Sequence, residues 1–274
     1  MMPRKLGIIA GSGPLPLTLA HHCRDNGQPV FVVLLKGQAD AADYGGLDFA
    51  EFRVGAAGGM IKRLQGEGVE DLVFIGSVRK PLLSAVRPDA WAAKFLLKTA
   101  VFSKGDDTFL KTLVSALEEE GFKVRGVDEL MPELLAPIGC VTEKSPTTDD
   151  LRDIEVGTAA ALALGARDEG QAAVAAGGQT LTVEDRAGTA AMLANLAANR
   201  PEGESGGVLV KTVKPGQERR ADLPAIGPDT VAQARAAGLS GIAISAGSAL
   251  LLEREKTIHA ANEAGLFIIG IETP

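Results

Sequence analysis

The chain has 274 residues, of which 46% are hydrophobic and 4% aromatic, and its formal net charge is −7 at pH 7. This length and apolar content exclude a mainly disordered chain and allow one large or two ordinary domains. The acidic balance argues against general nucleic-acid binding, because that function needs a basic surface to displace counterions from phosphates.

The first half of the chain alternates short apolar runs with helical patterns. The apolar runs predict buried strands, and they lie at residues 6–10, 30–35, 49–54 and 72–75. The helical patterns follow them at residues 15–24, 59–65, 89–102 and 107–119. This alternation predicts an α/β domain over residues 1–132 with a Rossmann-like, mostly parallel sheet and right-handed crossovers.

A change of composition marks the predicted domain boundary. Residues 133–149 contain Pro137, Pro146 and a Ser/Thr/Asp cluster, which predicts a linker. Residues 150–274 form the second predicted α/β domain. Its helices are expected at 151–164, 230–237 and 254–264, and its strands at 179–183, 207–213, 241–244 and 266–271.

Cysteine usage and hydropathy predict a cytoplasmic protein. Cys23 and Cys140 are the only cysteines, and neither belongs to a CxxC or Cys/His cluster, so we expect neither a disulfide framework nor structural zinc. Gly11 and Pro14 interrupt the N-terminal apolar run too early for a signal peptide. No stretch approaches the roughly 18 apolar residues of a membrane span.

The loop after the first predicted strand, Gly11-Ser12-Gly13, suits an anion. Backbone N–H groups and a helix N-terminus would meet there at the carboxyl end of a sheet, which favours a phosphate. The dinucleotide fingerprint is incomplete, because Pro16 stands where the third glycine belongs, and the second strand ends without a ribose-binding acid. A tight strand–helix turn without a ligand is the alternative.

Two further polar sites follow in the predicted N-terminal domain. Ser77, Arg79 and Lys80 come directly after a predicted strand, and two cations beside a glycine turn suit a diphosphate, although a solvated loop explains them as well. Asp106 and Asp107 open a predicted helix. They are candidates for metal binding, and helix capping is the plainer alternative.

The most informative segment runs from residue 211 to 227. Basic and acidic side chains crowd it, while prolines and glycines fix its path as an ordered loop after an apolar strand. Its cations are suited to neutralising phosphates, and its acids to holding Mg²⁺ or orienting water. The alternative is a surface loop whose charges compensate one another. The residues concerned are Lys211, Lys214, Gln217, Glu218, Arg220 and Asp222.

Together, the glycine turn and the runs GSVRKP, GDDTFL and VKTVKPGQERRADLPAIGPDTV resemble the UDP-2,3-diacylglucosamine pyrophosphatases of lipid A synthesis that lack a metallophosphoesterase fold. The likeness covers nearly the whole chain, and QERRADLPAIG is its most specific part. It implies two domains with a substrate cleft between them. It also implies Mg²⁺-dependent hydrolysis of the lipid–nucleotide substrate to lipid X and UMP.

The resemblance carries over, residue by residue, to Asp222, Arg220, Gln217 and the turn Gly11-Ser12-Gly13. Together with the local chemistry of the other candidates, it gives expected catalytic roles to Asp222, Glu218 and Arg220. The expected metal ligands are Asp222, Glu218, Asp106 and Asp107. Substrate binding falls to Gly11, Ser12, Gly13, Ser77, Arg79, Lys80, Lys211, Lys214 and Gln217.

Three positions depart from the pattern expected of the family. Glu218 stands where we expect aspartate, and Ala190 and Ser245 stand where we expect acids. The missing acids keep a non-catalytic nucleotide- or lipid-binding protein as one alternative. The turn after the first predicted strand keeps a nucleotide-dependent oxidoreductase as another. A lipid substrate implies peripheral contact with the inner membrane, and a homodimer is left open. No nucleic-acid partner is expected.

Overall fold

The computed structural model describes residues 3–78, 87–201 and 203–273 except 101–105, and the side chains of Ala100 and Asp106 are not described. The chain divides into two compact units. Unit 1 is Met1–Pro132 with Glu218–Asp222, and unit 2 is Glu133–Gln217 with Leu223–Pro274. Each unit carries its own sheet, which confirms the predicted fold class of two α/β domains.

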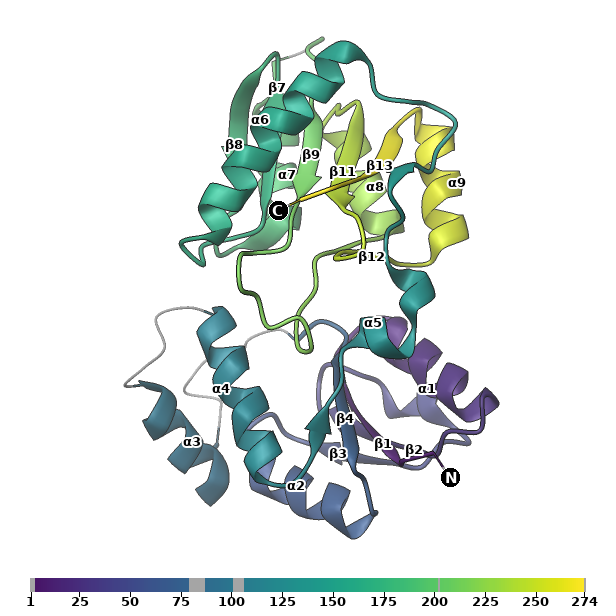
Figure 1. The fold of residues 1–274 in the computed structure, drawn as a ribbon, viewed down its shortest axis with the longest axis vertical. Helices are drawn as coiled ribbons and strands as arrows, with labels where there is room; N and C mark the ends of the chain where they lie inside the picture. The colour runs from purple at the N-terminus through teal and green to yellow at the C-terminus, as the bar shows by residue number, and fades with distance from the viewer. Residues whose placement is uncertain (1–2, 79–86, 101–105, 202, 274) are drawn as a thin grey trace. The chain divides into compact units, whose positions relative to one another are not determined.

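Unit 1 is built on a five-stranded parallel sheet in the order β3-β2-β1-β4-β5 (Figure 1). Its strands are β1 (Leu6–Ala10), β2 (Val30–Leu35), β3 (Phe49–Phe52), β4 (Asp71–Ile75) and β5 (Lys123–Val124). The order reverses between β1 and β4. In open α/β sheets, the carboxyl ends of two such strands flank the crevice where ligands bind.

Helices complete the core of unit 1. They are α1 (Leu15–Asp25), η1 (Ala41–Tyr44), α2 (Ala57–Gly66), α3 (Ala90–Ala100), α4 (Asp106–Glu119) and α5 (Val127–Leu130). Buried apolar side chains of β2, α2 and α4, such as Phe31, Leu64 and Val114, form one cluster. Trp91 stacks on Phe95, so these two aromatic side chains of α3 contribute to packing.

Unit 2 contains a mixed six-stranded sheet in the order β6-β13-β11-β9-β7-β8. Its strands are β6 (Gly139–Cys140), β7 (Ala172–Ala176), β8 (Gln179–Val183), β9 (Val208–Lys211), β11 (Gly241–Ser245) and β13 (Phe267–Ile271). β9, β11 and β13 are parallel, and the other three strands run antiparallel to their neighbours. A separate parallel pair joins β10 (Ala225–Ile226) to β12 (Leu250–Leu251).

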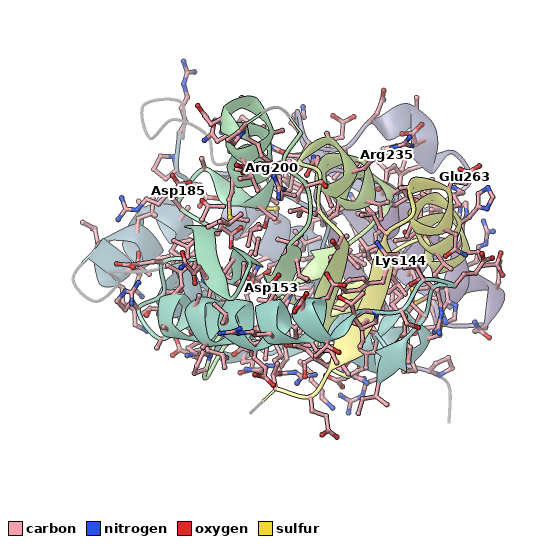
Figure 2. The ribbon with its side chains drawn as sticks, turned by 90° about the horizontal axis from the view of Figure 1, so that it is seen from above. Lys144, Asp153, Asp185, Arg200, Arg235 and Glu263 are labelled. Carbon is pink, nitrogen blue, oxygen red and sulfur yellow. The ribbon has the colours of Figure 1, made fainter. Side chains whose placement is uncertain are left out.

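Helices cover both faces of the unit 2 sheet (Figure 2). The helix α6 (Thr148–Gly165) lies on one face, where Ile154 packs with Val210 and Phe267. On the other face lie α7 (Gly188–Asn199), α8 (Pro228–Ala236) and α9 (Arg254–Ala264), which share the larger apolar cluster. Among the described residues, no helix is long and apolar enough to cross a membrane.

Two parts of unit 2 differ from expectation. The stretch predicted as a linker contains the turn η3 (Pro132–Leu134) and the edge strand β6, and the backbone N–H of Val141 donates to Ile268. Strand β7 and helix α7 were not predicted. β7 is rich in alanine, which has low strand propensity, and it lacks the β-branched runs that mark the other buried strands.

Two buried threonines in unit 2, compared with each other, give a stability prediction. Within the described part of the chain, Thr212 Oγ1 has no hydrogen-bond partner, whereas Thr257 Oγ1 donates to the carbonyl of Leu252 at 2.6 Å. Both residues are at most 1% exposed. We expect Thr212→Val to be neutral or to stabilise by up to about 1 kcal/mol, and Thr257→Val to destabilise by about 1–2 kcal/mol. Urea unfolding followed by circular dichroism measures both, and an equal loss in the two variants would contradict this assignment.

Candidate functional site

The loops that follow β1 and β4 are joined at the switch point of the unit 1 sheet. The backbone N–H of Ser12 donates to the carbonyl of Ser77 at 2.7 Å, and the reciprocal bond is 3.0 Å. The two hydroxyl oxygens lie 2.8 Å apart. The structure therefore brings together the predicted residues of the glycine turn and Ser77. Arg79 and Lys80 lie outside the described residues.

Glycines permit this close approach. A Cβ atom on Gly11 would lie 2.5 Å from the Ser77 carbonyl oxygen, and one on Gly76 would lie 2.8 Å from the Ser12 carbonyl oxygen. Gly76 also has a φ of +89°, which disfavours other residues. The sequence analysis predicted a role for Gly11 and noted the glycine turn at Gly76, but it could not show that the opposite loop excludes a side chain at Gly76.

Local chemistry limits how this turn can bind an anion. Pro14 caps α1 and Pro16 lies in its first turn, so neither provides an N–H group. The N–H groups of Gly11 and Ser12 donate to Ile75 and Ser77. An anion at this turn would therefore depend on later N–H groups and on the serine hydroxyls.

A second set of candidates lies on the strap, which we define as residues Glu218–Asp222. Although it follows β9 of unit 2 in sequence, the strap belongs to unit 1. Its first backbone N–H, that of Glu218, donates to Asp107 Oδ1 at 2.7 Å. At its other end, Ala221 packs against the apolar cluster of unit 1. The predicted pair Asp107 and Glu218 is thus brought together.

Arginines fasten the strap further. Arg220 Nε and Nη2 donate to the two carboxylate oxygens of Glu218 at 2.8 and 2.9 Å, and Nη1 donates to Glu118 at 2.7 Å. Arg219 pairs with Asp128 at 3.3 Å. Glu118 and Asp128 were not predicted, because nothing local marks a charge partner that is about a hundred positions away.

The Glu218–Arg220 pair is ionised on both sides. Hydrogen bonds from Arg220 hold the pKa of the Glu218 carboxyl below its ordinary value, although burial and the nearby Asp107 charge act in the opposite direction. Glu218 in turn raises the pKa of the Arg220 guanidinium. The two-pronged geometry is typical of strong Arg–carboxylate pairs.

The carboxylates of the described residues suit only a sparse magnesium site. Both oxygens of Glu218 accept from Arg220, and Asp107 pairs with Lys111 at 2.6 Å. The described residues contain no group of three or more His, Cys, Asp or Glu side chains placed to hold a metal ion. These carboxylates could offer at most one or two ligands to a Mg²⁺, an ion that usually keeps several waters when it binds to proteins. The side chain of Asp106 is not described.

The candidates in unit 2 have local partners. Lys211, which is 8% exposed, donates to the carbonyl of Ala225 at 3.1 Å. Lys214 pairs with Asp168 at 2.7 Å, and its backbone N–H donates to the side chain of Gln217 at 2.8 Å. These contacts give the three predicted substrate-binding residues of unit 2, Lys211, Lys214 and Gln217, a structural role within that unit.

The position of Ser245 is equally local. Ser245 is fully buried at the end of β11, where its hydroxyl accepts the N–H of Val213 at 3.3 Å and lies 3.0 Å from Thr273 Oγ1. The serine that stands in place of an expected acid therefore connects the segments that follow β9 and β13 at the carboxyl edge of the sheet.

Models of known protein families match both halves of the chain. Residues 5–134 match the model of the LpxI N-terminal domain, and residues 137–269 match that of the LpxI C-terminal domain. The chain belongs to the LpxI family. The resemblance seen in the sequence is thereby confirmed.

One curated LpxI relative aligns over nearly the full length of both proteins. It is the UDP-2,3-diacylglucosamine pyrophosphatase LpxI of Caulobacter vibrioides, which is 40% identical over 278 residues and covers 98% of each chain. Among solved structures, a putative NAD-dependent epimerase/dehydratase from Methylobacillus flagellatus has a TM-score of 0.27 and 16% identity. That match covers 53% of this chain and 44% of the other. So low a score supports no argument.

The ion pair on the strap makes a pH-dependent prediction for this LpxI chain. The pKa of Glu218 is depressed in the folded state, so the pair stabilises the fold above the ordinary glutamate pKa of about 4.3 and loses this effect as the pH falls through the depressed value. We expect Arg220→Gln to lower the urea midpoint of unit 1 at pH 7 and the difference from wild type to shrink below about pH 4. Trp91, the only tryptophan, reports on unit 1 by fluorescence. A difference that is constant from pH 7 to pH 3 would contradict the prediction.

Proposed function

We propose that the protein hydrolyses the pyrophosphate bond of UDP-2,3-diacylglucosamine to 2,3-diacylglucosamine 1-phosphate, or lipid X, and UMP. The observation that carries this proposal is the alignment with the Caulobacter pyrophosphatase, which is 40% identical and leaves almost no part of either chain uncovered. The same reaction was implied by the motifs of the sequence. Its place would be the cytoplasm, with peripheral contact at the inner membrane where the lipid substrate resides.

Hydrolysis of a phosphoanhydride depends chiefly on positioning and on charge stabilisation. We assign the reacting carboxylate to Asp222, because both oxygens of Glu218 accept from Arg220. Asp222 would hold a Mg²⁺ and orient the attacking water. A bound Mg²⁺ supplies charge neutralisation and lowers the pKa of water.

The remaining candidates receive supporting roles in this proposal. The turn Gly11-Ser12-Gly13 and Ser77 would bind a phosphate group through hydroxyl and backbone donors. Arg79 and Lys80, which follow the same loop, would add positive charge. Glu218 and Arg220 would hold the strap in the shape that presents Asp222.

The test is hydrolysis of purified UDP-2,3-diacylglucosamine with Mg²⁺ and, in parallel, with EDTA. The proposal predicts release of UMP and lipid X that stops on chelation. Tight substrate binding without any release would instead support the non-catalytic binding protein. Binding of NAD in a fluorescence titration would support the oxidoreductase.

A further inference from the structure

Asp168 lies in an unusual backbone conformation just after α6. Its φ is +54°, in the left-handed region that glycine and asparagine occupy most readily at helix ends. Its N–H donates to the carbonyl of Gly165 at 2.9 Å, so the position ends the helix. Glycine would satisfy the backbone here without strain. The presence of aspartate at this position therefore indicates a role for its side chain.

The partner of this side chain is Lys214. Its ammonium donates to Asp168 Oδ1 at 2.7 Å, and the two side chains are only 12% and 24% exposed. The stem of Lys214 packs on Gly165, where an added Cβ would come within 3.3 Å of it. A neighbouring pair on the same turn, Arg167 and Glu169, is 58% and 56% exposed. The Asp168–Lys214 pair is thus the shielded one, and shielding strengthens an ion pair.

Lys214 also begins the turn that leads into the strap. The N–H of Gln217 donates to the carbonyl of Lys214 at 3.1 Å, and the Gln217 side chain accepts the N–H of Lys214 at 2.8 Å. Pro215 and Gly216, whose φ is +71°, occupy the middle of this turn. Glu218 follows immediately. The path of the chain into the strap is therefore fixed at Lys214.

We propose that Asp168 is a positioning residue of the reaction: through Lys214 it fixes the turn 214–217, from which the chain enters the strap that carries Asp222. This inference rests on the proposed function for its catalytic readout. It gives Lys214 the task of holding this turn in place of binding phosphate. If the Asp168–Lys214 pair is lost, Asp222 is still present but adopts the productive geometry less often, which lowers kcat more than it changes KM.

The test compares Asp168→Asn with Glu169→Gln. Asparagine keeps the size of the side chain and tolerates the left-handed conformation, but it removes the charge that Lys214 meets. We expect kcat to fall roughly tenfold in Asp168→Asn, with KM within about twofold of wild type, because a shielded charge-assisted hydrogen bond is lost. Glu169→Gln, which alters the exposed pair on the same turn, should match wild type.

A double variant tests whether Asp168 acts through Lys214. Lys214→Met should reduce kcat by about as much as Asp168→Asn, and the double variant should be no slower than either single variant. Losses that multiply, or wild-type kcat in Asp168→Asn, would overturn the proposal.

Amide hydrogen exchange separates this inference from the proposed function. Peptides covering residues 212–224 should exchange faster in Asp168→Asn than in wild type or Glu169→Gln, whatever reaction the protein catalyses. Faster exchange in a protein that releases no UMP would contradict the proposed reaction and support the role of the Asp168–Lys214 pair. Unchanged exchange would contradict that role even if the wild type is active.

Discussion

Asp222→Asn is expected to lower the turnover of UDP-2,3-diacylglucosamine about a thousandfold, as is typical when a group that orients or deprotonates a nucleophile is lost. The substitution preserves size and removes the negative charge that the proposed Mg²⁺ and water require. The bonds of Glu218 to Asp107 and Arg220 remain available to hold the strap in this variant. We expect the fold to persist. Release of UMP, with circular dichroism as a check on folding, measures the effect.

A matched control is available in Asp229, an exposed residue in the first turn of α8. Asp229→Asn changes charge by the same amount close to Asp222 in sequence, and we expect its turnover to stay within about twofold of wild type. If Asp222→Asn retained activity comparable to that of Asp229→Asn, the assignment of Asp222 would fail. The family relationship would be unaffected.

Gly76→Ala is expected to destabilise unit 1 by about 3 kcal/mol, which combines the strain of a left-handed backbone with a steric clash. The new Cβ would lie 2.8 Å from the carbonyl oxygen of Ser12 and 2.9 Å from Pro16 Cγ. Relief requires the two loops to separate, which breaks the reciprocal bonds between Ser12 and Ser77. Phosphate binding at this turn should weaken as well.

Gly121→Ala isolates the backbone contribution. Gly121 has a similar φ of +97°, but no heavy atom lies within 4 Å of a Cβ placed on it. We expect this control to lose only about 1 kcal/mol. Urea unfolding followed by the fluorescence of Trp91 measures both variants. Equal losses would show that the loops accommodate the added methyl group, contrary to the close approach described above.

The parts of the fold that sequence could predict are those with a local signal. Val30–Leu35 is a run of large apolar residues, and Phe267–Ile271 is another apart from Gly270; short runs of this kind, rich in β-branched and aromatic residues, favour buried strands. The strand Ala172–Ala176 has no such signal. It is a strand because β9 offers it hydrogen bonds on one side and β8 on the other. Tertiary pairing decided its structure against its propensity.

The same distinction applies to the candidate site. The crowding of charge and the prolines after β9 marked the strap as an ordered, polar segment. The sequence could not indicate that the two arginines of the strap would pair with Glu118 and Asp128, because those contacts span about a hundred residues. The metal-binding role expected of Glu218 stays a prediction. The structure shows that both of its carboxylate oxygens accept hydrogen bonds from Arg220.

The place of the strap has a consequence for dissecting the molecule. The backbone passes from one unit to the other three times, after Pro132, after Gln217 and after Asp222. A fragment beginning at residue 133 would carry the strap away from Asp107, Glu118 and Asp128, and the complementary fragment would lack the packing of Ala221 on its apolar cluster. A cut between the two halves named by the family models therefore divides unit 1, and we expect the N-terminal half expressed alone to be less stable than unit 1 in the whole chain.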